Sequence, residues 1–302
     1  MNPCGNIMAS PFVVYVALFY LCFFRSSVTA SSCSAQPIWL PLSNCTITEI
    51  TIPDVISWGA AIGVGNSSQE LCFVPSTVVN NTLVISSEAC SNANAQNETA
   101  AQCRSRRGNY VDQSALTTTS LASLKPDPGW AAIMSPLPAF QYAVDAVLQL
   151  RSDASVDMPE GLITEGQNYT TSHLGLGIDS ELLEQLVNIG MIPARTWGLN
   201  PGSQSVVNPR DGNLVLGGFD QASVKDDFVT YDMNYPVAES SGGRDCPLQV
   251  FIEHLIMRPV GGSDIPLSDK SSPIPTCLEP YVANSATPKG MNFVNLTPPQ
   301  LR

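Results

Sequence analysis

Residues 174 to 220 carry the strongest fold signal in the chain. This stretch opens with LGLGIDSELLEQLVNIGMIP (174–193), continues with WGL (197–199) and closes with GNLVLGGFD (212–220). Glycines bound its first apolar segment, which predicts a glycine-bounded hydrophobic hairpin. Near its end, residues 213–216 have the composition of a strand, and Gly217-Gly218 supplies the tight turn that ends it.

A short helix is predicted between these two parts. Apolar residues recur there at helical spacing, at Leu182, Leu183, Leu186 and Val187. Ser180 is the expected N-cap and Gly190 the expected stop, with Pro193 just beyond.

This order of parts resembles the late part of the first lobe of a pepsin-like aspartic peptidase. That family has an apolar-apolar-Gly strand, a Ser-led helix ending Gly-x-Ile, a strand, and then Gly-x-Leu-x-Leu-Gly-Gly-x-Asp. This chain has every piece in order, the last at 212–220. The resemblance implies a mainly β, pepsin-like acid-protease β-barrel fold with two lobes. It extends roughly from Trp58 to Tyr281, so we expect the C-terminal lobe to be incomplete. A fold alone does not define an activity.

The first-lobe acid of the family is expected at Ser76. Aspartic peptidases use two carboxylates, one from each lobe, that face each other and share a proton. Ser76 stands where the family has Asp, and Val78 where it has Gly, although the surrounding motif is kept. The matched positions are Ile62, Gly63, Gly65, Gln69, Thr77, Val84 and Cys90. A serine hydroxyl does not ionise near acidic or neutral pH, so it cannot share the proton.

The second acid position is matched by Glu279. Pro280 and Tyr281 then replace the family's Thr and Gly, and Pro288 lies at the distance of the family's Pro. Pro280 lacks the N–H that a supporting network would use. The alternative is that Glu279 is an ordinary surface carboxylate. No intact catalytic pair is therefore expected.

Three functions follow from these residues. The first is a catalytically inactive aspartic-peptidase-like protein whose cleft binds a peptide, a cell-wall component or a partner, or has no specific ligand. The second is an active endopeptidase that uses other acids, with Asp54, Asp264 and Asp269 as candidates. The third is a structural surface glycoprotein without a saturable ligand.

Composition excludes several other classes. Charged residues make up 13% of the 302 residues and apolar residues 44%, which is enough for a sizeable core. The net charge of −12 leaves no basic stripe for nucleic acid. No P-loop, dinucleotide motif or Gly-x-Ser-x-Gly elbow occurs, and His173 and His254 are not expected to act as bases. Without Cys-x-x-Cys or His-rich spacing, we expect neither a metal nor a cofactor.

Residues 1–30 are predicted to be a secretory signal peptide. The apolar run 11–24 is short for a membrane span, and Val28-Thr29-Ala30 offers small residues for cleavage. Residues 1–10 carry no Lys or Arg, so an uncleaved anchor is the alternative. No membrane span is expected beyond this segment, and the mature protein is expected to be secreted or at the cell surface.

Sequons and a hinge complete the expected organisation. Residues 31–237 form the N-terminal lobe, a Gly/Ser hinge begins at 238, and residues 238–302 start the truncated C-terminal lobe. Candidate N-glycosylation sites are Asn44, Asn66, Asn80, Asn97, Asn168 and Asn295.

Seven of the nine cysteines remain after removal of the signal, and most should pair in an oxidising compartment. The odd count leaves one thiol free, pairs it between chains, or places its partner outside this chain. The family resemblance implies a disulfide between Cys90 and Cys103, and Cys246 with Cys277 is the second candidate pair.

The remaining segments have weaker signals. Residues 31–54 have no predicted strand, two or three strands are expected within 55–85, and others at 143–150 and 159–164. The basic cluster at 104–107 is a solvated loop or, alternatively, a processing site, and we favour the loop. No flap hairpin is predicted between 104 and 150. A new β-run begins at 248.

Overall fold

The fold is seen in a computed structural model of the full chain. The residues that it describes are 35–45, 57–65, 69–77, 79–91, 99–125, 142–164, 171–203, 209–224, 228, 230, 248–257, 262–266 and 273–277.

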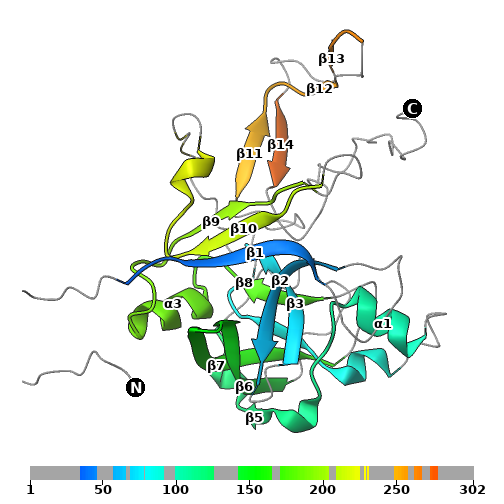
Figure 1. Ribbon diagram of the computed structural model, residues 1–302, viewed down its shortest axis with the longest axis vertical. Helices are drawn as coiled ribbons and strands as arrows, with labels where there is room; N and C mark the ends of the chain where they lie inside the picture. Colours follow the sequence, from blue (N-terminus) through cyan, green and yellow to red (C-terminus); the bar gives the residue numbers. More distant parts are fainter. Residues whose placement is uncertain are drawn as a thin grey trace, which may run out of the picture.

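The main structure is a ten-stranded sheet of which six strands close into a barrel. The strands follow the order β5-β6-β7-β4-β8-β3-β2-β1-β10-β9, and a further pairing of β6 with β2 completes the ring (Figure 1). The barrel strands are β2 (Ser57–Val64), β3 (Gln69–Ser76), β4 (Leu83–Ile85), β6 (Tyr142–Arg151), β7 (Ala154–Ile163) and β8 (Ser172–Gly175). The prediction of a mainly β fold is confirmed.

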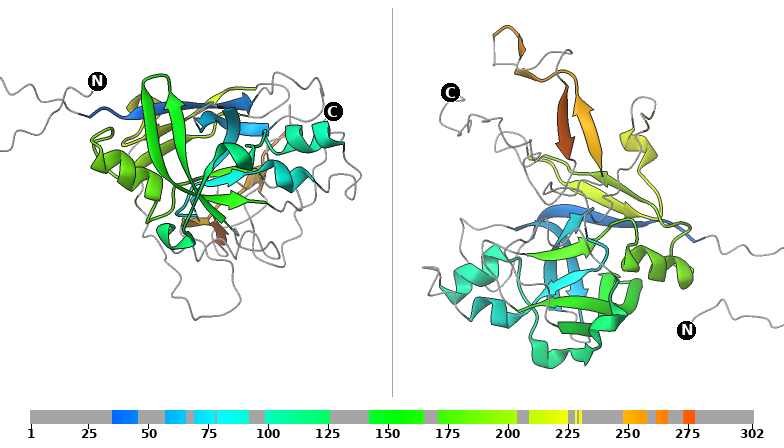
Figure 2. Two further views of the ribbon diagram at one scale, coloured as in Figure 1. Left: turned by 90° about the horizontal axis from the view of Figure 1, so that it is seen from below. Right: turned by 180° about the vertical axis from the view of Figure 1, so that it is seen from behind.

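Three strands extend the sheet beyond the barrel. β1 (Ile38–Cys45) pairs with β2 through its last residues and with β10 (Gly212–Leu216) through its first. β9 (Trp197–Asn200) then pairs with β10 and forms the end of the sheet. In Figures 1 and 2 these three strands form a layer across one end of the barrel. At the other end of the strand order, β5 (Thr117–Thr119) pairs with β6.

β8 lies between two strands that are consecutive in the chain. β3 and β4 do not pair with each other; β8 is parallel to β3 and antiparallel to β4. Phe73 is level with Ser172, and Ser76 with Gly175. The barrel therefore closes only when a segment about a hundred residues further along the chain is inserted.

Alternating side chains fill the barrel interior, as a period of two in each strand requires. The inward residues of the β6–β7 hairpin belong to one buried apolar core: Val144, Ala146, Leu148, Leu150, Val156, Met158 and Leu162. This hairpin is longer than the sequence predicted, because β7 begins at Ala154 and not at 159. Polar residues at Ser155 and Asp157 concealed its first half; both are exposed on the outer face.

The predicted helix is α3 (Glu181–Asn188). The Ser180 hydroxyl accepts a hydrogen bond from the Leu183 amide at 3.2 Å and donates one to the Gly175 carbonyl at 2.6 Å. Gly190, with a φ of 71°, ends the helix in the left-handed region. Both predicted boundary residues are confirmed.

Two segments differ from expectation. The N-terminal segment contains β1, whose buried residues Ile38, Leu40 and Leu42 alternate with exposed ones. The polar segment after Ser86 contains η1 (Ser87–Cys90) and α1 (Ala100–Arg106), which were not expected. Thr99 and Gln102 form a capping box that starts α1.

The remaining elements are short. Three are single 3-10 turns, and four form two separate two-stranded sheets, β11 with β14 and β12 with β13. The predicted β-run at 248–257 supplies β11 and β12. The bounds of these remaining elements are η3 (Gln113–Ala115), η4 (Leu121–Ser123), η5 (Gln221–Ser223), β11 (Gln249–Ile252), β12 (Ile256–Met257), β13 (Ile265–Pro266) and β14 (Ile274–Cys277).

Replacing Ser180 with alanine tests the junction between β8 and α3. The change removes a helix cap and a buried hydrogen bond to Gly175, and we expect it to lower the free energy of unfolding by about 2 kcal/mol. Urea denaturation followed by tryptophan fluorescence measures the loss. Ser120→Ala is the matched control, since Ser120 caps η4 at the surface; an equal loss in both variants would contradict the assignment.

Candidate functional site

Ser76 ends β3 in the barrel wall and is fully buried, with 0% of its surface exposed. Its carbonyl accepts a hydrogen bond from the Leu176 amide at 2.9 Å. Its hydroxyl has no hydrogen-bond partner among the described residues. The position where the resemblance expects the first catalytic acid is therefore held rigidly by backbone pairing, and its side chain is closed off from solvent.

The loop from Ser76 to β4 is held by the segment that joins β8 to α3. The Gly177 amide donates to the Val79 carbonyl at 2.9 Å, and the Glu181 amide to the Asn80 carbonyl at 3.0 Å. The side-chain oxygen of Asn80 accepts from the Asp179 amide at 3.1 Å. Each of these bonds joins residues about a hundred positions apart, so the loop has the conformation that α3 imposes on it.

Two glycines permit this approach. A Cβ atom on Gly175 would lie 2.5 Å from the Asn81 carbonyl oxygen, and one on Gly177 would collide with the Asn80 side chain. Real Cβ atoms do not approach that closely, so glycine at both positions is a steric requirement.

Among the described residues, the groups around Ser76 provide no familiar hydrolytic chemistry. A nucleophilic serine needs a base within hydrogen-bond reach, and a water-activating pair needs a carboxylate. No His, Asp or Glu in the described part of the chain is hydrogen-bonded to the Ser76 hydroxyl. His173 lies in β8 with 1% of its surface exposed, and burial lowers its pKa to about 4, so it is neutral above that pH.

Of the other predicted acids, only Asp264 lies among the residues that the structure describes. Glu279, Asp54 and Asp269 lie outside the described residues. Asp264 is exposed in the short segment before β13, and His254 is exposed between β11 and β12. No pair of these groups is placed together by the described structure.

The glycosylation candidates separate by exposure. Asn44 is exposed near the end of β1 and can carry a glycan. Asn80 is only 7% exposed, and its side-chain oxygen accepts a hydrogen bond from the Asp179 amide, so this candidate is buried in the folded loop and stays a prediction. Asn66, Asn97, Asn168 and Asn295 lie outside the described residues.

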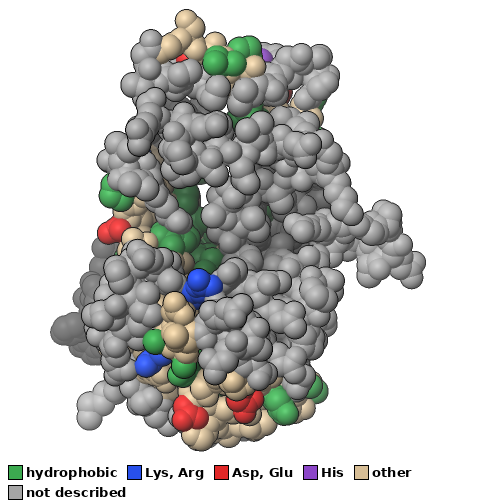
Figure 3. Space-filling model, turned by 90° about the vertical axis from the view of Figure 1, so that its right-hand side faces the viewer, with side chains coloured by type: hydrophobic (Ala, Val, Ile, Leu, Met, Phe, Trp, Pro, Cys, Tyr) green, Lys and Arg blue, Asp and Glu red, His purple; other side chains and the backbone are tan. Residues whose placement is uncertain are grey.

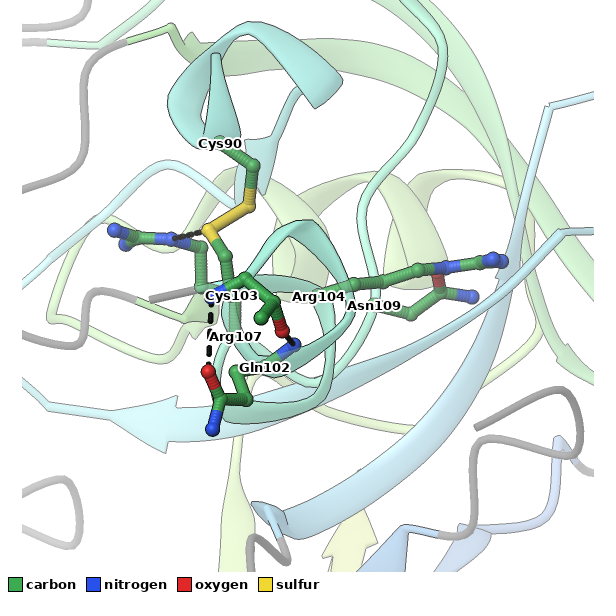
Figure 4. Close-up of a disulfide and its surroundings, with 7 residues drawn as sticks. Cys90, Gln102, Cys103, Arg104, Arg107 and Asn109 are labelled. Atoms are coloured by element: carbon green, nitrogen blue, oxygen red, sulfur yellow. Dashed lines mark hydrogen bonds between the residues drawn. A yellow bond between two sulfur atoms is a disulfide. The ribbon is translucent and has the colours of Figure 1, made fainter. Parts of the chain in front are cut away.

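Two disulfides are present. The expected Cys90–Cys103 bond joins η1 to α1, with the Cα atoms 5.9 Å apart (Figure 4). Cys45–Cys72, with Cα atoms 5.8 Å apart, was not predicted, since it joins β1 to β3 across β2 and local spacing gives no signal for it. Cys246 and the side chain of Cys277 lie outside the described residues, so that pair stays a prediction.

The basic cluster packs around the Cys90–Cys103 disulfide, and the solvated-loop prediction is wrong. Arg107 is 2% exposed, and its Nε donates to the Cys103 sulfur at 3.1 Å (Figure 4). Arg104 donates to the Asn109 side chain at 2.7 Å, and its guanidinium lies 5.4 Å from the Tyr110 ring centre. Processing proteases need an accessible extended segment, whereas these arginines belong to a disulfide-tied helix and its end. Their role in the fold is structural.

A pocket of about 650 Å³ lies between β9 and the segment around η5. Three aromatic residues, Trp197, Phe219 and Phe228, form part of its wall. Trp197 donates its indole N–H to the Leu176 carbonyl, and the rings of Phe219 and Phe228 meet edge to face with their centroids 5.1 Å apart. Phe219 and Phe228 are 51% and 68% exposed. This pocket was not predicted, because its walls come from segments that are separate in the chain.

The polar groups of this pocket are engaged with one another. Asp220 accepts from the hydroxyl of Ser223, and this bond lowers the pKa of Asp220 below its usual value. Asn200 donates to the same Ser223 hydroxyl at 3.5 Å. The pocket therefore offers aromatic and apolar contact surface more than free hydrogen-bonding side chains.

Other classes of site find no support in the described residues. No group of three or more His, Cys, Asp or Glu side chains there could hold a metal ion. Among the described side chains on the face that Figure 3 presents, the charged ones are scattered and form no continuous basic patch. In the part of the chain that is described, no helix has the length and apolarity to cross a membrane.

Comparison of the sequence with models of protein families and with curated proteins finds no match.

The Gly175→Ala variant tests the steric requirement at the Ser76 loop. The new methyl group has to displace the Asn81 carbonyl, so we expect the free energy of unfolding to fall by about 3 kcal/mol. Gly190→Ala is the control: nothing lies within 4 Å of that Cβ, and only its positive φ is strained, which costs about 1 kcal/mol. Equal losses by urea denaturation would show that the close contact is wrong.

Proposed function

We propose that this chain is a secreted, catalytically inactive relative of the pepsin-like aspartic peptidases that acts by binding. The proposal rests first on Ser76. Its buried hydroxyl lies at the end of a barrel strand, at the position that the family resemblance assigns to an aspartate. A hydroxyl cannot take part in a proton-sharing carboxylate pair, whatever residue faces it.

The pepsin-like assignment is supported by the arrangement around Ser76. The glycine-bounded strand β8, the Ser-capped helix α3 and the strand β10 occur in the order that the resemblance requires. β8 also pairs directly with β3, so the segment that carries the resemblance lies beside the segment with the altered acid position. The two-lobed layout, with a shortened second lobe beginning near β11, is part of the proposal.

Secretion is supported by two independent features. Residues 1–30 have the pattern of a signal peptide, and two disulfides are present in the described part of the chain. Disulfides persist in oxidising compartments and are uncommon in the cytosol. Asn44, exposed beside Cys45, is the glycosylation site that this structure favours.

A binding role is supported by the pocket beside β9. Its volume of about 650 Å³ falls within the range of small-ligand sites. Its aromatic walls suit an apolar side chain of a peptide or the flat face of a cell-wall sugar. Because its polar groups are already bonded to one another, a peptide with an apolar anchor is the favoured ligand.

The absence of catalysis is tested with the purified secreted protein. We expect no cleavage of a denatured protein substrate at acidic pH, and no change on adding pepstatin, because the first acid is missing. A pepsin-like enzyme serves as the positive control. Pepstatin-sensitive cleavage would contradict the proposal; loss of that cleavage in Asp54→Asn or Asp269→Asn would then identify the acids of an active endopeptidase.

The binding role is tested on peptide and cell-wall glycan arrays. We expect saturable binding of peptides with an aromatic or aliphatic anchor, weakened about tenfold by Phe228→Ala, because that ring forms one wall of the pocket. Phe251→Ala is the matched control, since Phe251 is also an exposed aromatic residue and lies on β11, outside the pocket lining. Absence of any saturable ligand would favour the structural glycoprotein.

A further inference from the structure

We propose that Glu160 makes the folded barrel more stable at acidic pH than at neutral pH. Its carboxyl group fits the interior of the barrel only in the protonated form, so the free energy of unfolding falls as the pH rises towards neutrality. The inference concerns the barrel itself, and it does not depend on the proposed function.

Glu160 faces the interior of the barrel. It lies on β7, where the alternate residues Val156, Met158 and Leu162 all belong to the apolar core. Its register partner on β6 is Val144, which is also in the core. None of the surface of Glu160 is exposed. A side chain that can ionise therefore occupies a position that the strand pattern reserves for an apolar residue.

No hydrogen bond from a described residue stabilises the ionised form of this carboxyl group. Both of its oxygens lack a hydrogen-bond partner among the described residues. An isolated ionised carboxylate in an apolar interior is strongly unfavourable, and such a group keeps its proton instead. Burial accordingly raises the pKa of Glu160 well above its ordinary value, and the nearby carboxylate of Asp157 acts in the same direction.

The charged groups on the surrounding elements do not offset this. Two cations, Lys125 and Arg151 of β6, are bonded elsewhere. Lys125 pairs with Glu181 and Glu184 of α3, and Arg151 pairs with Asp153. Across β4, which carries no titratable residue, His173 of β8 is level with Leu83. Leu83 belongs to a second apolar cluster, so His173 faces away from the interior. The neighbouring strand β6 has three titratable residues, Tyr142, Asp145 and Arg151. All three are exposed to solvent and so do not face the barrel interior with Glu160.

The sign of the pH effect follows from these positions. Below the ordinary glutamic acid pKa of 4.5, both the folded and the unfolded chain hold the proton, and Glu160 contributes no pH dependence. Above 4.5 the unfolded chain releases the proton while the folded chain retains it. The folded chain then binds more protons, so stability falls with rising pH until the folded-state pKa is reached. Within that window the unfolding equilibrium constant increases by up to tenfold per pH unit.

The experiment compares urea denaturation of the full chain at several pH values between 4 and 7 at fixed ionic strength. Glu160→Gln keeps the shape of the side chain and removes its ionisation. The unfolding equilibrium constant of this variant should therefore rise less steeply with pH than that of the unaltered chain, and the difference should reach up to tenfold per pH unit. At pH 7 the variant should be the more stable protein. Glu70→Gln, which removes an exposed carboxylate from barrel strand β3, should keep the original slope.

A second measurement covers the case in which Glu160→Gln fails to fold. The carboxyl carbon of Glu160 in the folded unaltered protein should give the NMR shift of a protonated acid at pH 6, where an exposed glutamate is ionised. An ionised Glu160 at pH 6, or equal pH slopes in the unaltered chain and Glu160→Gln, would overturn the proposal.

Discussion

The close approach of the β8–α3 junction to the loop after β3 is the contact on which the structure depends. β3 and β4 are separated in the barrel by β8, so the barrel cannot close until that later segment is inserted. The insertion needs glycine at 175 and 177, because backbone and the Asn80 side chain occupy the space of any Cβ. Ser180 then joins the two parts by bonding the Gly175 carbonyl and capping α3.

The same contact determines what the barrel can do chemically. By fixing the loop after β3, it places Ser76 where its hydroxyl is buried and has no hydrogen-bonded base among the described residues. The backbone is thus held in place at a position whose side chain cannot act as the carboxylate of an acid–base pair. An open pocket lies elsewhere, beside β9, where aromatic rings remain exposed. This separation of the buried Ser76 from the open pocket supports the binding role that we propose.

Local signals predicted the elements whose side chains and turn residues agree. α3 and β10 were recognised because cap, periodicity and terminal glycine all coincide within a few residues. α1 was missed because it is short and polar and its stability comes from a capping box and a disulfide. β1 was missed because Pro41 interrupts a strand whose buried residues alternate correctly. Arg107 appeared to be a surface charge, yet the fold buries it against Cys103.

From the sequence, the family resemblance implied the mainly β class, and cap residues with helical spacing predicted the helix between Ser180 and Gly190. The serine at position 76 is read directly from the sequence. Three other features follow from the folded arrangement alone: Asn80 is buried, Cys45 pairs with Cys72, and Glu160 faces the core. Each of those outcomes depends on which distant strands become neighbours, and strand pairing across a hundred residues leaves no mark in local spacing.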